Sequence, residues 1–162
     1  MRTTNIVIAC LLATVLSTAA AHAQVKHIQT ANSGIATAVW VGDTLYVSGQ
    51  LPSPTTPADR ATSKPAVWGN TQVQADNTFG KIEAILKEQG LGMGDVVMMR
   101  VYMVGDPAMD NKLDFAGMNA AYAKLFGTAA QPNKPARSTM QVAALVNPGP
   151  LLEIEVQAAR HK

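Results

Sequence analysis

Cysteine and histidine, which often serve in metal binding and nucleophilic chemistry, are scarce in this sequence. It contains one cysteine, Cys10, and three histidines, of which only His27 and His161 lie beyond residue 23. Cys10 lies in an N-terminal segment that we expect to be removed, so the remaining chain has no thiol. This excludes disulfide bonds, thiol catalysis and cysteine-based metal sites. Histidines near the chain ends offer no Ser-His-Asp arrangement, and we predict that the protein uses no metal.

The sequence also lacks an excess of positive or negative charge. Without Arg2, 12 of the 13 Lys and Arg residues remain against 11 Asp and Glu residues, a formal net charge of +1. No run of like charge stands out, so neither nucleic acid nor a membrane surface is an expected partner. Few aromatic residues are present, which predicts a mostly aliphatic core with some apolar surface reserved for other subunits. The methionines are scattered without a cluster typical of copper ligands, so we expect them to pack in the core.

The N-terminal apolar run is too short to span a membrane. Residues 6–16 follow the basic start Met1-Arg2 and precede Ala21-His22-Ala23, a pattern typical of signal-peptide cleavage. A transmembrane helix needs roughly 20 apolar residues. We therefore predict a signal peptide over residues 1–23, cleaved after Ala23, and a single domain over residues 24–162. Export without disulfide bonds is compatible with a bacterial periplasm, and no membrane association is expected after cleavage.

Hydrophobic periodicity predicts the element order β-β-α-β-α-β-β. The elements are two strands within residues 38–49 that turn at Gly42-Asp43, a helix over 70–89, a strand over 96–104, a helix over 111–126, and strands over 137–145 and 151–159. Residues 24–33 are expected to be a polar lead-in. Residues 51–69 are rich in proline and are expected to form a long irregular loop.

This order predicts an α+β domain. Hairpins at both ends of the chain imply a mixed sheet, with the two helices packed on one face. The other face of such a sheet needs a cover, and burial against other subunits is the expected one.

Arg137 and Glu153 carry the main chemical hypothesis. An arginine fork suits a bidentate hold on a substrate carboxylate, and a glutamate on a strand with one apolar face suits water activation or proton transfer. If the last two strands form a hairpin centred near Pro148, Glu153 pairs near Ala143, and the two side chains start roughly 20 Å apart. That is too far for one small substrate. Either the register is broken, or the two residues that work together come from different subunits.

Several motifs are spread over most of residues 39–159. They are Val47-Ser48-Gly49-Gln50, the turn from Gly90 into Val96, Phe115-x-x-x-Asn119-x-x-Tyr122-x-x-x-Phe126, Pro135-Ala136-Arg137-Ser138, Gln141-Val142-Ala143-Ala144-Leu145 and Glu153-Ile154-Glu155. Together they resemble the Rid family, also called YjgF, the reactive-intermediate deaminases.

The resemblance implies a chorismate-mutase-like α+β fold and a homotrimer with three sites in clefts between subunits. It implies hydrolysis of enamine/imine intermediates, such as 2-iminobutanoate and 2-iminopropanoate, to 2-oxo acids and ammonia, without a metal or organic cofactor. By motif position, Arg137 binds the substrate carboxylate and Glu153 orients or activates the water. Asn119 lies near the cleft, and Ser48 and Gly49 line it.

The sequence departs from the family pattern in ways that affect substrate range. Ile35 stands roughly where several members carry a tyrosine, and Thr139 replaces a frequent cysteine. The loop of residues 51–69 is long and can reshape the mouth of the cleft. The exported location is also unusual for imine hydrolysis, because such imines arise from cytoplasmic pyridoxal-phosphate enzymes.

Alternatives to each assignment remain open at this point. Arg137 can form a structural ion pair, Glu153 can be a solvated edge residue, and Asn119 can bond to a neighbouring strand. Tyr122 is expected in the core or at an interface. The alternative function is a non-catalytic trimer that binds a small carboxylate or acts as a chaperone-like partner. A ribonuclease is disfavoured, because the chain has no basic stripe.

Overall fold

The computed structural model describes residues 24–160, so the predicted signal peptide, with Cys10, lies outside the described residues. The described chain forms one six-stranded sheet with the spatial order β1-β2-β3-β6-β4-β5. The strands are β1 (Val25–Ile28), β2 (Ala38–Val41), β3 (Thr44–Gln50), β4 (Val96–Met103), β5 (Ala136–Gln141) and β6 (Leu152–Ala159). Every neighbouring pair is antiparallel except β4 and β5, which run parallel.

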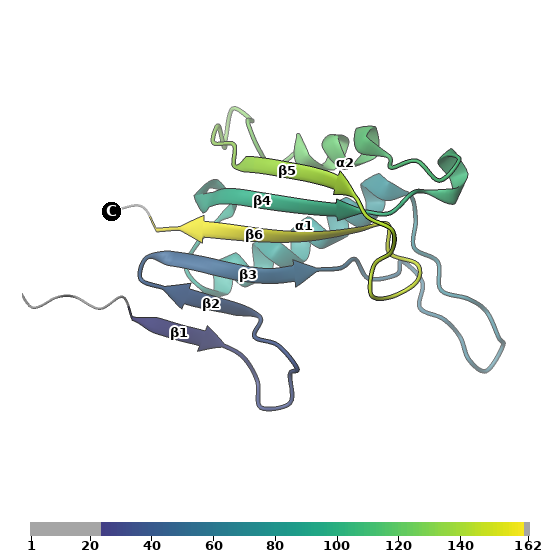
Figure 1. The fold of residues 1–162 in the computed structure, drawn as a ribbon, viewed down its shortest axis with the longest axis horizontal. Helices are drawn as coiled ribbons and strands as arrows, with labels where there is room; N and C mark the ends of the chain where they lie inside the picture. Colours follow the sequence, from purple (N-terminus) through teal and green to yellow (C-terminus); the bar gives the residue numbers. More distant parts are fainter. Residues whose placement is uncertain (1–23, 161–162) are drawn as a thin grey trace, which may run out of the picture.

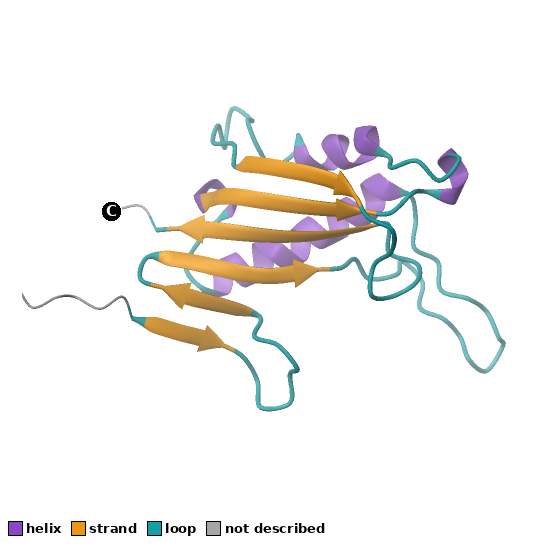
Figure 2. Cartoon of the chain, in the orientation of Figure 1, coloured by secondary structure: helices purple, strands orange, loops and turns teal. Residues whose placement is uncertain are grey.

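Both helices, α1 (Thr71–Glu88) and α2 (Phe115–Tyr122), lie on the same face of this sheet (Figure 1). The predicted mixed sheet with helices on one face is therefore confirmed. The opposite face, called the open face below, carries no helix (Figure 2). Among the described residues, no helix is both long and apolar enough to cross a membrane.

The core lies between the helices and the sheet. The strands contribute alternate side chains to it, because successive residues of a strand point to opposite faces. Residues fully buried there are mainly aliphatic and methionine side chains, as predicted, and include Leu45, Ile82, Leu86, Met99, Val101, Met103, Met118, Leu152 and Ile154. Each such side chain contributes on the order of 1.5–3 kcal/mol by leaving water.

The predicted C-terminal hairpin is wrong. β4 lies between β5 and β6, pairing with β5 in parallel and with β6 antiparallel. β5 follows β4 through α2, and such a crossover brings two strands together in parallel. β6 is buried at every second position, so it fits the middle of the sheet, between β3 and β4, better than an edge.

Smaller differences concern element ends. The predicted lead-in of residues 24–33 contains β1, an edge strand that pairs only with β2. The second helix begins at Phe115 rather than at residue 111, because Asp110 and Asn111 adopt positive φ and Asp114 caps the helix by accepting from the Gly117 N–H at 2.8 Å. β5 ends at Gln141, four residues before the predicted end.

The start of α1 depends on a side-chain cap. Asn70 Oδ1 accepts from the Val73 N–H at 3.0 Å. We expect Asn70→Ala to destabilise the fold by about 1 kcal/mol, because one N–H of the first turn loses its partner. That corresponds to a fall in Tm of about 3–4 °C for a domain of this size, measurable by calorimetry. Gly80→Ala, in the open middle of the same helix where nothing lies within 4 Å of an added Cβ, should instead raise Tm; a fall of equal size there would contradict this account.

Candidate functional site

Arg137 lies on β5 in a cradle formed by one face of α2. Its Nη2 donates to Asn119 Oδ1 at 2.9 Å. The guanidinium carbon lies 4.4 Å from the centroid of the Tyr122 ring and 5.7 Å from that of Phe115. The three cradle residues are spaced i, i+4 and i+7, so the helix presents them side by side. Asn119 thus bonds to a neighbouring strand through the arginine side chain itself.

The cradle is anchored in the core. The Tyr122 ring stacks on Phe126 at 4.7 Å between centroids, and Phe126 meets the buried Phe79 edge-on at 6.1 Å. Burial raises the pKa of the Tyr122 phenol, while the positive charge of Arg137 opposes that shift. Tyr122 therefore stays neutral at physiological pH and supports Arg137 as an aromatic face.

Arg137 has no acidic partner in the part of the chain that the structure describes. It forms no ion pair with any described carboxylate, and its Nη1 is buried without a hydrogen-bond partner among the described residues. A half-buried cation without a counter-charge is costly, and the structural ion pair considered above does not form among the described residues. A guanidinium that is held in place, with one donor left unpaired by the described residues, suits a carboxylate ligand.

Two strands on from Arg137, Glu153 lies on β6 against the backbone of β3. A Cβ built on Gly49 would collide with the Glu153 carboxylate, with 2.9 Å to Cδ and 3.1 Å to Cγ. Only glycine at this position leaves room for the carboxylate. Sequence reasoning placed Gly49 in the site, and the structure brings it into direct contact with Glu153.

Glu153 also borders a hollow of about 300 Å³, called the Glu153 hollow below. Its lining combines two carboxylates with a mostly apolar wall and consists of Tyr102, Val142, Ala144, Leu145, Val146, Glu153 and Glu155. This arrangement suits a small ligand with an apolar part beside a group that can exchange a proton with a carboxylate.

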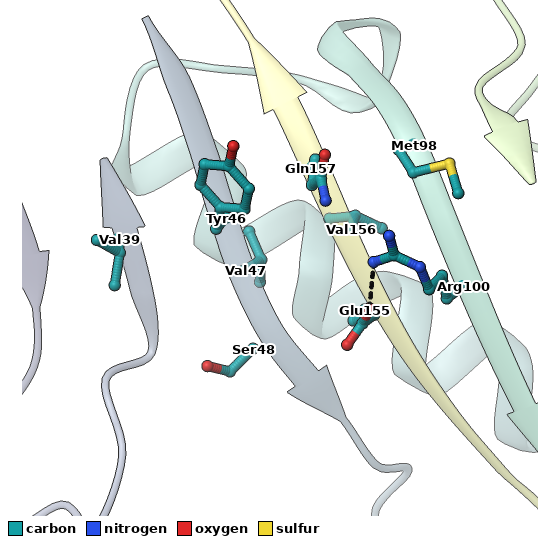
Figure 3. Close-up of a pocket in the computed structure, with 9 residues that line it drawn as sticks. All are labelled: Val39, Tyr46, Val47, Ser48, Met98, Arg100, Glu155, Val156 and Gln157. Carbon is teal, nitrogen blue, oxygen red and sulfur yellow. Dashed lines mark hydrogen bonds and ion pairs between the residues drawn. The ribbon is translucent and has the colours of Figure 1, made fainter. Parts of the chain in front are cut away.

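Ser48 lies on the same open face as Glu153. Its hydroxyl donates to the Ala36 carbonyl at 2.7 Å, next to Ile35, whose side chain is 71% exposed. Ser48 lines a second hollow of about 180 Å³, shown in Figure 3. Across that hollow, Arg100 pairs with Glu155 at 2.6 Å. Sequence reasoning missed this pair, although the matching alternation of β4 and β6 is consistent with it.

The candidate residues fall into two groups on opposite faces of the sheet. Arg137 is level with Met99 and, one strand further, with Val156, both of which are buried under the helices. Glu153 is level with Tyr102 and is an odd number of residues from Val156, so its side chain points to the open face. Arg137 with Asn119, and Glu153 with Gly49, are therefore two groups that do not meet within one chain, called half-sites below. Ser48 shares the open face with Glu153 but lines the other hollow.

Thr139 belongs to the Arg137 side. It is two residues further along β5, and its hydroxyl is buried with no hydrogen-bond partner within residues 24–160. A buried hydroxyl with no hydrogen bond costs free energy. We expect Thr139→Val to raise Tm by a few degrees in thermal unfolding. Ser138→Ala, one residue away on the other face, serves as the control; a clear fall in Tm for Thr139→Val would show that the hydroxyl is satisfied.

No metal site is evident in the part of the chain that the structure describes. No group of three or more His, Cys, Asp or Glu side chains within residues 24–160 is placed to hold a metal ion.

Comparisons with known proteins decide the family. The family model described as endoribonuclease L-PSP matches residues 20–160. This chain belongs to the YjgF/RidA/RutC family. A RutC family protein of Pyrococcus abyssi is 34% identical over 125 residues, covering 77% of this chain and 84% of that protein. A RutC family protein of Haemophilus influenzae is 33% identical over 140 residues, covering 85% and 97%.

Solved structures of the YjgF/RidA/RutC family have the same fold. RidA from an Antarctic Psychrobacter matches with a TM-score of 0.60 and 32% identity, over 83% of this chain and 99% of that one. A YjgF family member from Neisseria meningitidis matches with a TM-score of 0.61 over 87% of this chain and 98% of its own, and at 22% identity it supports the fold alone. The expected chorismate-mutase-like α+β fold of this family is thus confirmed.

Proposed function

We propose that this protein hydrolyses small enamine/imine intermediates, of the 2-iminobutanoate and 2-iminopropanoate type, to 2-oxo acids and ammonia. The observation that carries the proposal is Arg137, which has no counter-charge among the described residues and is held by Asn119 and Tyr122 with its Nη1 unpaired. An imino acid offers the carboxylate that such a cation lacks. Membership of the YjgF/RidA/RutC family supports the same reaction class.

In the proposed reaction, Arg137 binds the substrate carboxylate, and Glu153 accepts and donates protons as a general base and acid. Water adds to the carbon of the protonated C=N bond, and Glu153 takes one proton of that water, which gives a neutral carbinolamine. Glu153 then returns this proton to the amino nitrogen. The C–N bond breaks, and the hydroxyl proton of the carbinolamine passes to the departing ammonia, so that the products are the C=O bond of the 2-oxo acid and an ammonium ion. No redox change occurs, and the proposed steps use only water and side chains of the protein.

Because the two half-sites lie on opposite faces, we propose that Arg137 of one copy works with Glu153 of another. A homotrimer with sites between subunits, as the family resemblance implies, provides such an arrangement. The open face, with its hollows and no covering helix, is the surface available for that contact. The predicted signal peptide adds the proposal that this trimer works outside the cytoplasm.

Mixing two inactive variants tests the shared site. Arg137→Ala and Glu153→Gln should each be nearly inactive alone, and co-refolding them in equal amounts should restore about a quarter of the wild-type rate, since that fraction of interfaces joins two intact residues in a closed ring. The rate is followed as loss of imine generated in situ. No recovery in oligomers shown by mass spectrometry to be mixed would place both residues in one site within a chain.

A second candidate function is binding of a small 2-oxo acid without turnover. Ile35, which stands roughly where several family members carry a tyrosine, favours this alternative, because its exposed side chain supplies no hydroxyl. Wild-type protein that binds 2-oxobutanoate by calorimetry, yet does not accelerate imine decay, would establish this alternative.

A further inference from the structure

The proline-rich segment of residues 51–69, called the excursion below, is fastened to α1 where it leaves the sheet. Lys81 Nζ donates to the Leu51 carbonyl at 2.7 Å, and the Ser53 N–H donates to Asn77 Oδ1 at 2.7 Å. Figure 2 shows the excursion as a long loop extending beyond the end of the sheet. It is less irregular than predicted, because bridges join Thr56 to Val67 and Asp59 to Lys64.

Where the excursion returns, Trp68 lies on a second loop. Gly149, in the segment of residues 142–151, has φ +105°, and a Cβ on it would collide with Trp68 Nε1 and Cε2, with 2.8 Å to Cζ2. The indole therefore lies directly against the Gly149 backbone, at a position that accepts no side chain in this arrangement.

Gln74 connects the end of the excursion to the segment of residues 142–151 through two hydrogen bonds. Its side chain is 1% exposed, and both ends of its amide are used. Nε2 donates to the Gly69 carbonyl at 3.1 Å, and Oε1 accepts from the Leu151 N–H at 2.8 Å. A buried amide whose donor and acceptor are both satisfied fixes its partners, because losing either bond leaves a buried polar group unpaired.

Both contacts act on the wall of the Glu153 hollow. The segment of residues 142–151 supplies the apolar side of that hollow through Val142, Ala144, Leu145 and Val146. Leu151, which Gln74 holds, comes two residues before Glu153. The excursion is thus joined through two independent contacts to the loop that shapes the space beside the carboxylate.

We propose that Trp68 and Gln74 are positioning residues for the Glu153 hollow: they hold residues 142–151 so that its apolar wall receives the aliphatic side chain of the substrate. The substrate class rests on the proposed function, whereas the positioning itself does not. The expected ligands are imino or oxo acids with an unbranched or branched aliphatic side chain. A substrate with a long polar side chain would find no polar partner on this wall.

Hydrogen exchange tests the positioning without any assay of activity. In Trp68→Ala, the Leu151 amide should exchange at least about 10-fold faster than in wild type, because the loop it belongs to opens locally. The amide of Val101, in the middle of β4, should not change. Val67→Ala, an exposed neighbour in the same excursion, is the matched control and should leave Leu151 protected.

Kinetics test the consequence for specificity. Trp68→Ala and Gln74→Leu should lower the ratio of kcat/KM for a long aliphatic imine over 2-iminopropanoate by about 10-fold, chiefly through KM, since an apolar wall acts on side-chain binding. Trp68→Phe should restore much of the ratio. If Trp68 and Gln74 had only a structural role, their replacement would lower kcat/KM equally for both substrates.

The outcomes separate the two proposals. If wild-type protein shows no turnover, the imine hydrolase proposal fails, and Leu151 exchange still decides whether Trp68 positions the loop. If wild-type protein is active but Leu151 exchange and the specificity ratio are unchanged in well-folded Trp68→Ala, the positioning proposal is overturned. If Trp68→Ala does not fold, the same two measurements on Gln74→Leu, which removes the acceptor of the Leu151 N–H, decide it: an unchanged specificity ratio and unchanged Leu151 exchange in that variant overturn the positioning proposal.

Discussion

Replacing Arg137 with alanine should lower imine hydrolysis by about 100-fold or more, because the carboxylate anchor that orients the substrate is lost. The same change should cost little stability. The native guanidinium is half-buried with no counter-charge, so its removal relieves a desolvation penalty that offsets the lost contacts with Tyr122 and Asn119. Initial rates with imine generated in situ, together with thermal unfolding, measure both effects.

Arg160 provides a matched control for this experiment. Its guanidinium carbon lies 4.2 Å from the Trp40 ring, in the same cation–π arrangement, but at the far end of β6 from Glu153. Arg160→Ala should leave turnover unchanged. Arg137→Lys should recover only part of the rate, because an ammonium cannot bind a carboxylate through two parallel bonds. Full activity in Arg137→Ala would exclude the proposed mechanism.

Gly49→Ala should separate activity from stability even more sharply. The added methyl group collides with the Glu153 carboxylate, the mobile end of a flexible side chain. The clash is therefore relieved by rotation of Glu153, and we expect a stability loss of only about 1 kcal/mol, the low end for overpacking. Turnover should nevertheless fall by about 100-fold, the usual contribution of a positioned general base.

Two comparisons isolate the cause of this effect. Gly34→Ala, with nothing within 4 Å of the new Cβ, should behave as wild type. In a Glu153→Gln background, Gly49→Ala should lower the rate no further, because both changes remove the same function. Additive losses, or unchanged activity in the single variant, would show that Gly49 does not act through Glu153.

The start of α1 and the cradle of Arg137 depend on local signals that the sequence carries, whereas the predicted start of α2 was four residues too early. Asn70 predicts the start of α1, and the spacing of Phe115, Asn119 and Tyr122 predicts a shared face. The partner of this face, Arg137, could not be predicted, because its position depends on how β5 pairs in the sheet. The side chains of β5 do not alternate in polarity: Arg137 and Thr139 point under the helices, while Met140 is 39% exposed.

The order of the last strands was not predictable from local pattern either. A proline-containing loop between two strand-like segments favours a hairpin, yet β6 enters between β3 and β4. That choice depends on long-range pairing, in which β6 satisfies both of its edges and buries Leu152, Ile154 and Val156. The face of Glu153, in contrast, follows directly from the alternation within β6, which the sequence shows clearly.

The separation of Arg137 and Glu153 onto opposite faces has a consequence for how the protein responds to dilution. A site divided between copies exists only while the copies are associated, so the rate per chain should fall once the concentration drops below that needed for assembly. Under the proposed function, the protein would therefore remove imines only above a threshold concentration of the chain. A ligand that bridges the two half-sites would lower that threshold, so substrate itself would favour assembly of the competent form.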